Sequence, residues 1–370
     1  MPPLSLSAGV RKARELGRRR LSLALARPRM VSPSAHYRLR PIDGVIVLQR
    51  GENASTDYYL RPRLERLPVE TRIVDLESTP SACDLLAAGG GESLLVILCR
   101  YAARPWLEAL DAARSRLARV AFFMDDDLPE MMRDPELPQA ARGKVAAHFG
   151  EHVEALGRLA SEVWASSPAL AARYPEARPA VLEPIPDADP PAPAMGAPMR
   201  VVYHGTDVHR RERRFVLEVA RRMAALGCEA VVEIVGDAAL ARTAAGLPSV
   251  SVIPQQPWPE YRRRQSAAAA AICLAPLHPS TVNGARAPVK AFDAARLGAA
   301  GLYADAEPYR GFVRDGVDGL LLPMEPQAWA EAAVQLMARP DRRLALAEAA
   351  RARLTLLRHG PIAFPAAPDA

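Results

Sequence analysis

The sequence predicts an α/β protein with two Rossmann-like, doubly wound domains, and three observations support this fold class. Apolar runs of strand length alternate with helical stretches, and the alternation starts afresh after residue 198. A chain of 370 residues is too long for one ordinary hydrophobic core. Residues 184–198 contain six prolines, which is the composition of a stiff linker. We therefore expect two parallel sheets joined by that linker.

The first domain should cover residues 41–183, after a basic arm over residues 1–40. Continuous apolar runs predict buried parallel strands, at residues 43–49, 71–76, 93–99, 120–124, 162–165 and 179–182. The intervening stretches predict helices, at residues 58–64, 105–117 and 139–159. A further helix should begin at Pro168, because Ser166 and Ser167 offer a cap and proline suits the first turn.

The second domain should cover residues 199–345, followed by a C-terminal helix and tail over residues 346–370. Its apolar runs predict strands at residues 200–203, 230–235, 250–253, 271–274, 300–303 and 319–322. Its helices are predicted at residues 213–226, 260–269, 288–297, 327–337 and 341–357. Ligands of such sheets bind at the carboxyl ends of the strands, so we expect the site in a cleft that both domains face.

The net charge of +6 is unevenly distributed, because residues 1–40 contribute +9 and the other 330 residues sum to −3. This distribution excludes a protein whose folded domains bind nucleic acid through a basic surface. We favour a flexible leader for the arm. The alternative is a basic amphipathic helix over residues 10–30 that lies on anionic lipid, which would hold a cytoplasmic protein at the inner face of the membrane. No run is long enough to span a bilayer.

Neither the cysteines nor the histidines predict a metal site. The four cysteines are scattered without a Cys-x-x-Cys pair, so we expect buried free thiols in a reducing cytosol. His148 and His152 have a spacing that zinc can use, but an ordinary helix surface explains them better. We expect no metal and no cofactor.

The strongest candidate site lies between Arg286 and Asp293. Lys290 falls in the first turn of a helix predicted from Pro288, where the dipole disfavours a cation. Arg286 lies just upstream, and two cations at this helix end are explained if Arg286 and Lys290 bind a phosphate together. Asp293 shares the face of Lys290 and could accept a hydrogen bond from a ribose hydroxyl. The alternative is a solvated Lys290–Asp293 ion pair, and the spacing leaves both open.

A second candidate follows the strand predicted at residues 200–203. Gly205 permits close approach of the backbone, and Thr206 offers a hydroxyl. Positive charge gathers beside the same strand end in His209, Arg210 and Arg211, which suits a diphosphate. One glycine is not a dinucleotide fingerprint. The alternative is a loop whose arginines are merely solvated.

A third candidate is Asp125–Asp127, at the end of the strand predicted at residues 120–124. These carboxylates could bind a metal, take a proton from an acceptor hydroxyl, or cap the next turn. Asp126 is the candidate for proton transfer. Arg100, at another strand end, is a plausible salt-bridge partner.

Several of these segments together resemble the retaining GT-B glycosyltransferases of glycosyl transferase group 1, or family four, which includes enzymes of bacterial surface-polysaccharide assembly. The resemblance is strongest over residues 200–340. It rests on a set of motifs in family order: Gly205–Glu212, Leu274–Leu277, Asn283, Lys290–Asp293, Leu297-Gly298, Pro308-Tyr309 and Asp315–Leu321. Phe123–Leu128, Trp164–Ser167 and Glu183–Asp187 match weaker features of the first half.

The resemblance implies transfer of a sugar from a nucleoside-diphosphate sugar to the hydroxyl of a glycan, lipid-linked or small-molecule acceptor. It assigns the diphosphate to Lys290 and the arginines, the ribose to Asp293, and the sugar pocket to Tyr309 with the Gly311 region. The acceptor would contact the first domain. The family's pair of glutamates is altered, since Ala285 replaces the first and the shorter Asp293 replaces the second. Ala271 also stands where an aspartate is common. An inactive GT-B binding or scaffold protein, or an epimerase of the same fold, are the alternatives.

Overall fold

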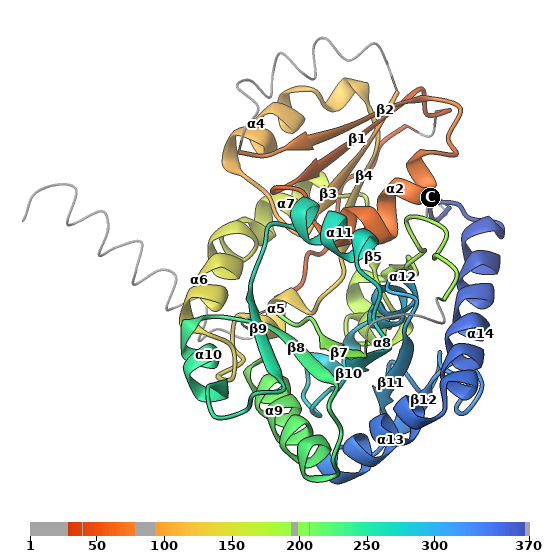
Figure 1. Ribbon diagram of the computed structural model, residues 1–370. Helices are drawn as coiled ribbons and strands as arrows, with labels where there is room; N and C mark the ends of the chain where they lie inside the picture. The colour runs from red at the N-terminus through yellow and green to blue at the C-terminus, as the bar shows by residue number, and fades with distance from the viewer. Residues whose placement is uncertain (1–28, 39, 78–92, 194–198, 207, 367–370) are drawn as a thin grey trace, which may run out of the picture. The chain divides into compact units, whose positions relative to one another are not determined.

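The computed structural model describes residues 29–38, 40–77, 93–193, 199–206 and 208–366 (Figure 1). Most of the basic arm, Cys83 and Asp207 lie outside these ranges, so what was predicted for them stays a prediction. Within the described part of the chain, no helix has the length and apolar character that a membrane span requires. The chain divides into two compact units. The first comprises Met1–Gly51, Leu67–Leu182 and Pro365–Ala370, and the second comprises Glu52–Arg66 and Glu183–Phe364.

The first unit contains a six-stranded parallel sheet in the order β2-β1-β3-β4-β5-β6. Its strands are β1 (Gly44–Gln49), β2 (Glu70–Asp75), β3 (Leu94–Cys99), β4 (Leu117–Met124), β5 (Glu162–Ala165) and β6 (Ala180–Val181). β1 and β3 pair with Val47 opposite Ile97, and every residue of both strands is buried. A strand covered on both faces must be apolar throughout, and this is why the sequence predicts these strands well.

The helices of the first unit differ from the prediction at three places, one of which is the short helix α5, which was not predicted. They are α4 (Arg104–Ala112), α5 (Leu128–Met131), α6 (Gln139–His148), α7 (Val153–Leu159) and α8 (Pro168–Ala171). The helix predicted at residues 105–117 ends at Ala112, because β4 already begins at Leu117. The helix predicted at residues 139–159 is interrupted at Phe149, whose buried ring stacks on Phe122 with centroids 5.5 Å apart. Ser167 caps α8 as predicted, accepting a hydrogen bond from the Leu170 amide at 3.0 Å.

The interruption also separates the two histidines that zinc spacing had singled out. His148 ends α6, whereas His152 lies in the 3₁₀ turn Gly150–His152, so they do not stand on one helix. In the described residues, no group of three His, Cys, Asp or Glu side chains is arranged to hold a metal ion.

The second unit contains a six-stranded parallel sheet in the order β12-β11-β10-β7-β8-β9. Its strands are β7 (Arg200–Tyr203), β8 (Val231–Gly236), β9 (Val250–Pro254), β10 (Ile272–Ala275), β11 (Ala300–Ala304) and β12 (Leu320–Leu322). Val201 of β7 pairs with Ile272 on one side and with Val232 on the other. The six predicted strands are therefore present, and the predicted class of two parallel-sheet α/β domains is confirmed.

Helices flank this second sheet, and α9 and α13 pack against each other (Figure 1). They are α9 (Arg210–Ala225), α10 (Ala238–Ala244), α11 (Trp258–Ala267), α12 (Lys290–Arg296), α13 (Pro326–Ala338) and α14 (Pro340–His359). α9 begins three residues earlier than the predicted start at residue 213. α10 was not predicted, although Asp237 caps it by accepting a hydrogen bond from the Leu240 amide at 2.8 Å. α12 is followed by Gly298 at φ +63°, a left-handed conformation that glycine adopts easily.

The segment Glu52–Arg66, which connects β1 to β2, belongs to the second unit, and we call it the strap. It contains a π-helical turn, Thr56–Leu60, followed by α2 (Arg61–Leu64). The carboxylate of Asp57 is buried and accepts hydrogen bonds from Trp258 Nε1 at 2.7 Å and from Arg262 at 2.6 Å. The backbone carbonyl of Tyr58 accepts a hydrogen bond from the Ile185 amide at 2.7 Å. Buried polar contacts thus fix the strap to the second unit.

Candidate functional site

The strand order of the second sheet reverses between β7 and β10, since β8 and β9 continue on one side and β11 and β12 on the other. In doubly wound sheets, ligands bind at the carboxyl ends of the strands beside such a reversal. β7 ends at Tyr203 and β10 ends at Ala275. Both stretches of chain that follow these ends carry residues predicted to bind a ligand.

Gly205 follows β7 at a point where a side chain would not fit. A Cβ atom added to it would lie 2.3 Å from the Tyr203 hydroxyl. Its carbonyl accepts a hydrogen bond at 3.3 Å from Arg213, which is buried in α9. The absent side chain therefore lets the turn between β7 and α9 lie close to the sheet.

Lys290, the first residue of α12, links the two stretches. Its Nζ donates a hydrogen bond to the His204 carbonyl at 2.6 Å and another to Asp293 Oδ2 at 2.8 Å. The Lys290 side chain is 28% exposed, so its ammonium group is held at the surface of the site without being sealed inside it. The structure thus brings together two groups of residues that the sequence singled out separately.

A second polar group follows the same two strand ends and is centred on His209. The Arg286 guanidinium lies 3.1 Å from His209 Nε2. Arginine can only donate, so we assign Nε2 as the acceptor and place the imidazole proton on Nδ1, which is 3.8 Å from Glu212 Oε2. The Asn283 amide donates to Glu212 Oε1 at 3.3 Å and to the His278 carbonyl at 2.9 Å. Asn283 and Glu212 therefore tie the chain after β10 to α9.

The remaining predicted residues differ in their exposure. Thr206 is exposed, as are Arg210 and Arg211 in the first turn of α9, at the carboxyl end of β7. Tyr309 is buried, and its ring lies 5.1 Å from that of Tyr303. Burial raises the pKa of Tyr309 well above its usual value, so its hydroxyl stays protonated. Its role in a sugar pocket stays a prediction.

Asp293 is buried and already hydrogen-bonded, whereas a ribose-binding residue would be expected to be open to the ligand. Asp293 is only 5% exposed, and its Oδ1 accepts a hydrogen bond from the Tyr58 hydroxyl of the strap at 2.6 Å. Burial alone would raise the pKa of Asp293, but Lys290 and Arg296 outweigh it and hold the pKa below its usual value. Each carboxylate oxygen thus already accepts a hydrogen bond from within the second unit, and little of the side chain is open to a ribose hydroxyl.

Sequence reasoning missed His204 and Glu233, which form a buried group under Lys290. His204 Nε2 lies 2.9 Å from Glu233 Oε1. Arg200 and Arg264 donate to the other carboxylate oxygen at 3.1 and 3.0 Å. Burial acts to raise the pKa of Glu233, but His204 and the two arginines lower it to about 2. The signal in the sequence was a lone acid inside the apolar run of β8.

In the first unit, Asp125–Asp127 follow β4 and take two separate roles. Asp127 is buried and caps α5, accepting a hydrogen bond from the Glu130 amide at 3.1 Å, which confirms the predicted cap. Asp125 and Asp126 face Arg100, whose guanidinium nitrogens lie 3.2 Å from a carboxylate oxygen of each. The predicted salt bridge is therefore present. Arg100 has φ +68°, a left-handed conformation that is costly for a side chain with a Cβ.

Further cations lie near Arg100. The Arg100 guanidinium carbon and Lys144 Nζ lie 5.5 and 5.6 Å from the centroid of the Tyr101 ring. Burial lowers the pKa of Lys144, and so does the positive charge of Arg50 and Arg100. Arg50 and Arg100 follow β1 and β3, between which the order of the first sheet reverses. By the same rule, this group is a second candidate site.

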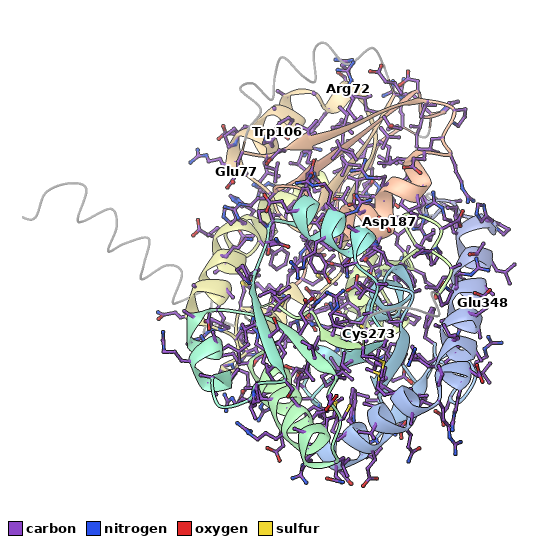
Figure 2. All side chains as sticks on the ribbon, viewed as in Figure 1. Arg72, Glu77, Trp106, Asp187, Cys273 and Glu348 are labelled. Atoms are coloured by element: carbon purple, nitrogen blue, oxygen red, sulfur yellow. The ribbon has the colours of Figure 1, made fainter. Side chains whose placement is uncertain are left out.

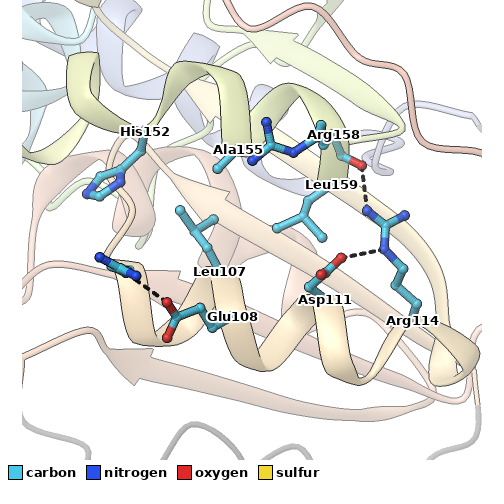
Figure 3. Close-up of a pocket in the computed structure, with 9 residues that line it drawn as sticks. Leu107, Glu108, Asp111, Arg114, His152, Ala155, Arg158 and Leu159 are labelled. Atoms are coloured by element: carbon cyan, nitrogen blue, oxygen red, sulfur yellow. Dashed lines mark hydrogen bonds and ion pairs between the residues drawn. The ribbon is translucent and has the colours of Figure 1, made fainter.

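Two pockets in the described part of the chain lie away from these groups. One, of about 320 Å³, lies between α4 and α7 (Figure 3). Its two acids, Glu108 and Asp111, each pair with an arginine at 2.7 Å. Another, of about 490 Å³, lies on α11 next to Glu52. We weigh the strand ends above these pockets, because they combine the sheet reversal with converging polar side chains.

Comparison with known proteins supports the fold. No protein-family model and no curated protein sequence matches this chain. Among solved structures, Anabaena HepE in complex with UDP and glucose is 15% identical, with a TM-score of 0.53 over 85% of this chain and 95% of HepE. Sucrose-phosphate synthase from Thermosynechococcus elongatus is 15% identical, with a TM-score of 0.50 over 95% of this chain and 89% of its own. TarM is 10% identical, with a TM-score of 0.50 over 74% of this chain and 54% of TarM.

The likeness to these structures concerns the fold, and it extends over both units. It confirms the two-domain α/β architecture of the GT-B type that the sequence motifs predict. Cys273 lies on β10 within the second sheet (Figure 2), inside the strand that the sequence predicts at residues 271–274.

Proposed function

We propose that this protein is a glycosyltransferase that moves a sugar from a nucleoside-diphosphate sugar to an acceptor hydroxyl. One observation carries the proposal. At the reversal between β7 and β10, two contacts join the chain after β10 to the chain after β7: Lys290 donates to the His204 carbonyl, and Arg286 lies 3.1 Å from His209, which directly precedes α9. HepE, which shares the fold, has been solved with UDP-glucose, and this gives further support.

The diphosphate is the part of the donor that this group suits best. In the transfer, the bond between the anomeric carbon and the phosphate oxygen breaks, and its electron pair stays on the diphosphate. Lys290 and Arg286 would offset the developing negative charge, together with the exposed Arg210 and Arg211. The amide groups in the first turn of α9 point in the direction that favours an anion.

The acceptor hydroxyl would be bound by the first unit, where Asp126 and Arg100 follow neighbouring strands. The hydroxyl oxygen forms the new bond to the anomeric carbon, and its proton passes to the Asp126 carboxylate. Arg100, 3.2 Å from this carboxylate, orients it. Transfer of a hexose with retention of configuration, into a surface polysaccharide, is the finer form of the proposal and comes from the family resemblance.

A thermal-shift panel with UDP, GDP, CDP and dTDP, and with sugars of each, tests the donor site. We expect one nucleotide family to stabilise the wild type and Lys290→Ala to remove most of the shift. Arg221→Ala is the matched control, because Arg221 is a cation on α9 that pairs with Glu218. If none of the nucleotides changes the melting temperature, the donor site is refuted. Binding without sugar transfer or donor hydrolysis would indicate an inactive binding protein, in keeping with Ala285.

For residues 10–30 we propose a test of the alternative to the flexible leader that we favour, namely a basic amphipathic helix that lies on anionic lipid. Sedimentation with vesicles that contain anionic lipid would compare the full chain with a variant that lacks residues 1–40. This alternative predicts that the full chain will sediment and the shortened one will stay in solution. Equal sedimentation of the two would refute it.

A further inference from the structure

The family resemblance assigns Asp293 to the ribose of the donor, but the contacts of this residue suit a structural role within the site. Asp293 lies in α12 and is covered on one side by Tyr58 of the strap. One carboxylate oxygen accepts from Tyr58 at 2.6 Å, and the other accepts from Lys290 at 2.8 Å. Both oxygens are therefore engaged, and the carboxylate is oriented by a donor on each side.

Tyr58 is itself held rigidly, which makes it a suitable anchor. Its side chain is 2% exposed, and its ring meets those of Trp258 and Phe292 edge-on at 5.7 and 5.5 Å. The Arg296 guanidinium carbon lies 5.2 Å from the ring centroid. The hydroxyl of Tyr58 is therefore fixed in position before any ligand arrives.

Lys290 has few other constraints. Apart from Asp293, its ammonium group bonds to the His204 carbonyl alone among the described contacts. A lysine side chain has four rotatable bonds, and a single hydrogen bond at its tip does not fix its direction. The Asp293 carboxylate supplies the second contact, so the placement of Lys290 depends on the placement of Asp293.

We infer that Asp293 is a positioning residue for Lys290 and that the Tyr58 hydroxyl of the strap sets the position of Asp293. This inference rests on the proposed function, since it explains how the chain presents a cation to the diphosphate of the donor.

A double-mutant cycle between Tyr58→Phe and Lys290→Ala tests the inference, with affinity for the diphosphate that binds the wild type as the readout. Tyr58→Phe keeps the ring packing and removes the hydroxyl. We expect it to weaken binding by about 10-fold, the effect of one hydrogen bond to a charged group. In the Lys290→Ala background the same change should have almost no effect, because the residue that it positions is absent. A purely structural effect of Tyr58→Phe would weaken binding equally in both backgrounds, and that result would overturn the inference.

A second measurement needs no nucleotide. The chain contains three lysines, Lys12, Lys144 and Lys290. Competitive acylation read by mass spectrometry therefore gives the reactivity of Lys290 relative to Lys144, which lies in the first unit. We expect this ratio to rise in Tyr58→Phe and in Asp293→Asn, because both loosen the hold on the ammonium group. Tyr37→Phe, which removes a hydroxyl bonded to the Leu159 carbonyl in the first unit, is the matched control and should leave the ratio unchanged.

The two measurements separate the inference from the proposed function. If the wild type binds no nucleotide but the acylation ratio rises in Tyr58→Phe, the positioning role stands and the proposed function fails. If the wild type binds a diphosphate but the ratio and the affinity are unchanged in Tyr58→Phe, the positioning role is wrong and the donor site stands.

Discussion

Replacing Glu233 with glutamine would remove one buried negative charge while keeping the size of the side chain. Three groups face this carboxylate: His204 at 2.9 Å, Arg264 at 3.0 Å and Arg200 at 3.1 Å. The carboxylate is only 6% exposed, so the solvent screens these interactions weakly. Glu233→Gln would leave the two arginines facing a neutral amide inside the second unit.

The magnitude follows from the pKa of Glu233, which is lowered from 4.5 to about 2 in the folded chain. A difference of about 2.5 pKa units corresponds to about 3 kcal/mol in the free energy of unfolding. Because the folded pKa is the lower one, this stabilisation is complete above about pH 4.5 and is lost as the pH falls towards 2. Near pH 3 it should have decreased to about 1.5 kcal/mol.

Urea unfolding followed by pulsed hydrogen exchange and mass spectrometry measures this effect, because it reads peptides of β7 and β8 separately from the first unit. We expect Glu233→Gln to lower the unfolding free energy of these peptides by about 3 kcal/mol at pH 7 and by about half as much near pH 3. Peptides of β1 and β3 serve as the internal control and should not change. A loss of the same size at both pH values would show that the charge of Glu233 is not what stabilises the unit.

Two further predictions concern single residues. Gly205→Ala should destabilise the second unit by about 1–3 kcal/mol, because the new Cβ would lie 2.3 Å from the Tyr203 hydroxyl. Pulsed hydrogen exchange of β7 would measure this loss. Unchanged exchange would show that the turn can move to make room for the Cβ. Cys273 should resist iodoacetamide at pH 8 in the folded protein, because burial raises the pKa of its thiol to about 12. Cys228 is only half-buried and should be alkylated first, and peptide mass spectrometry would reveal the opposite order if the burial of Cys273 is wrong.

The sequence predicted the sheets well for a physical reason. Strands such as β3 and β10 are buried on both faces and must be continuously apolar, which leaves a clear pattern. Helix ends were less accurate. The break at Phe149 comes from a ring that stacks on Phe122, and this contact spans two elements that no local pattern connects.

The candidate site was predicted in part. Lys290, Arg286 and His209 stood out because cations gathered at two strand ends, and the structure links those ends through the Arg286–His209 and Lys290–His204 contacts. The contact between Tyr58 and Asp293 could not be predicted, because it joins residues 235 positions apart and depends on the strap packing against the second unit. Charge and spacing predict which side chains carry chemistry. They do not predict which partner occupies each oxygen.

The central claim is that a nucleoside-diphosphate sugar binds at the reversal between β7 and β10. Hydrogen exchange with and without UDP-glucose, and with the corresponding GDP, CDP and dTDP sugars, tests it most directly. The account predicts that the sugar nucleotide which binds will slow exchange at residues 204–213 and 283–290, and that Lys290→Ala will abolish this protection. Protection confined to other parts of the chain, such as the pocket between α4 and α7, would contradict the claim.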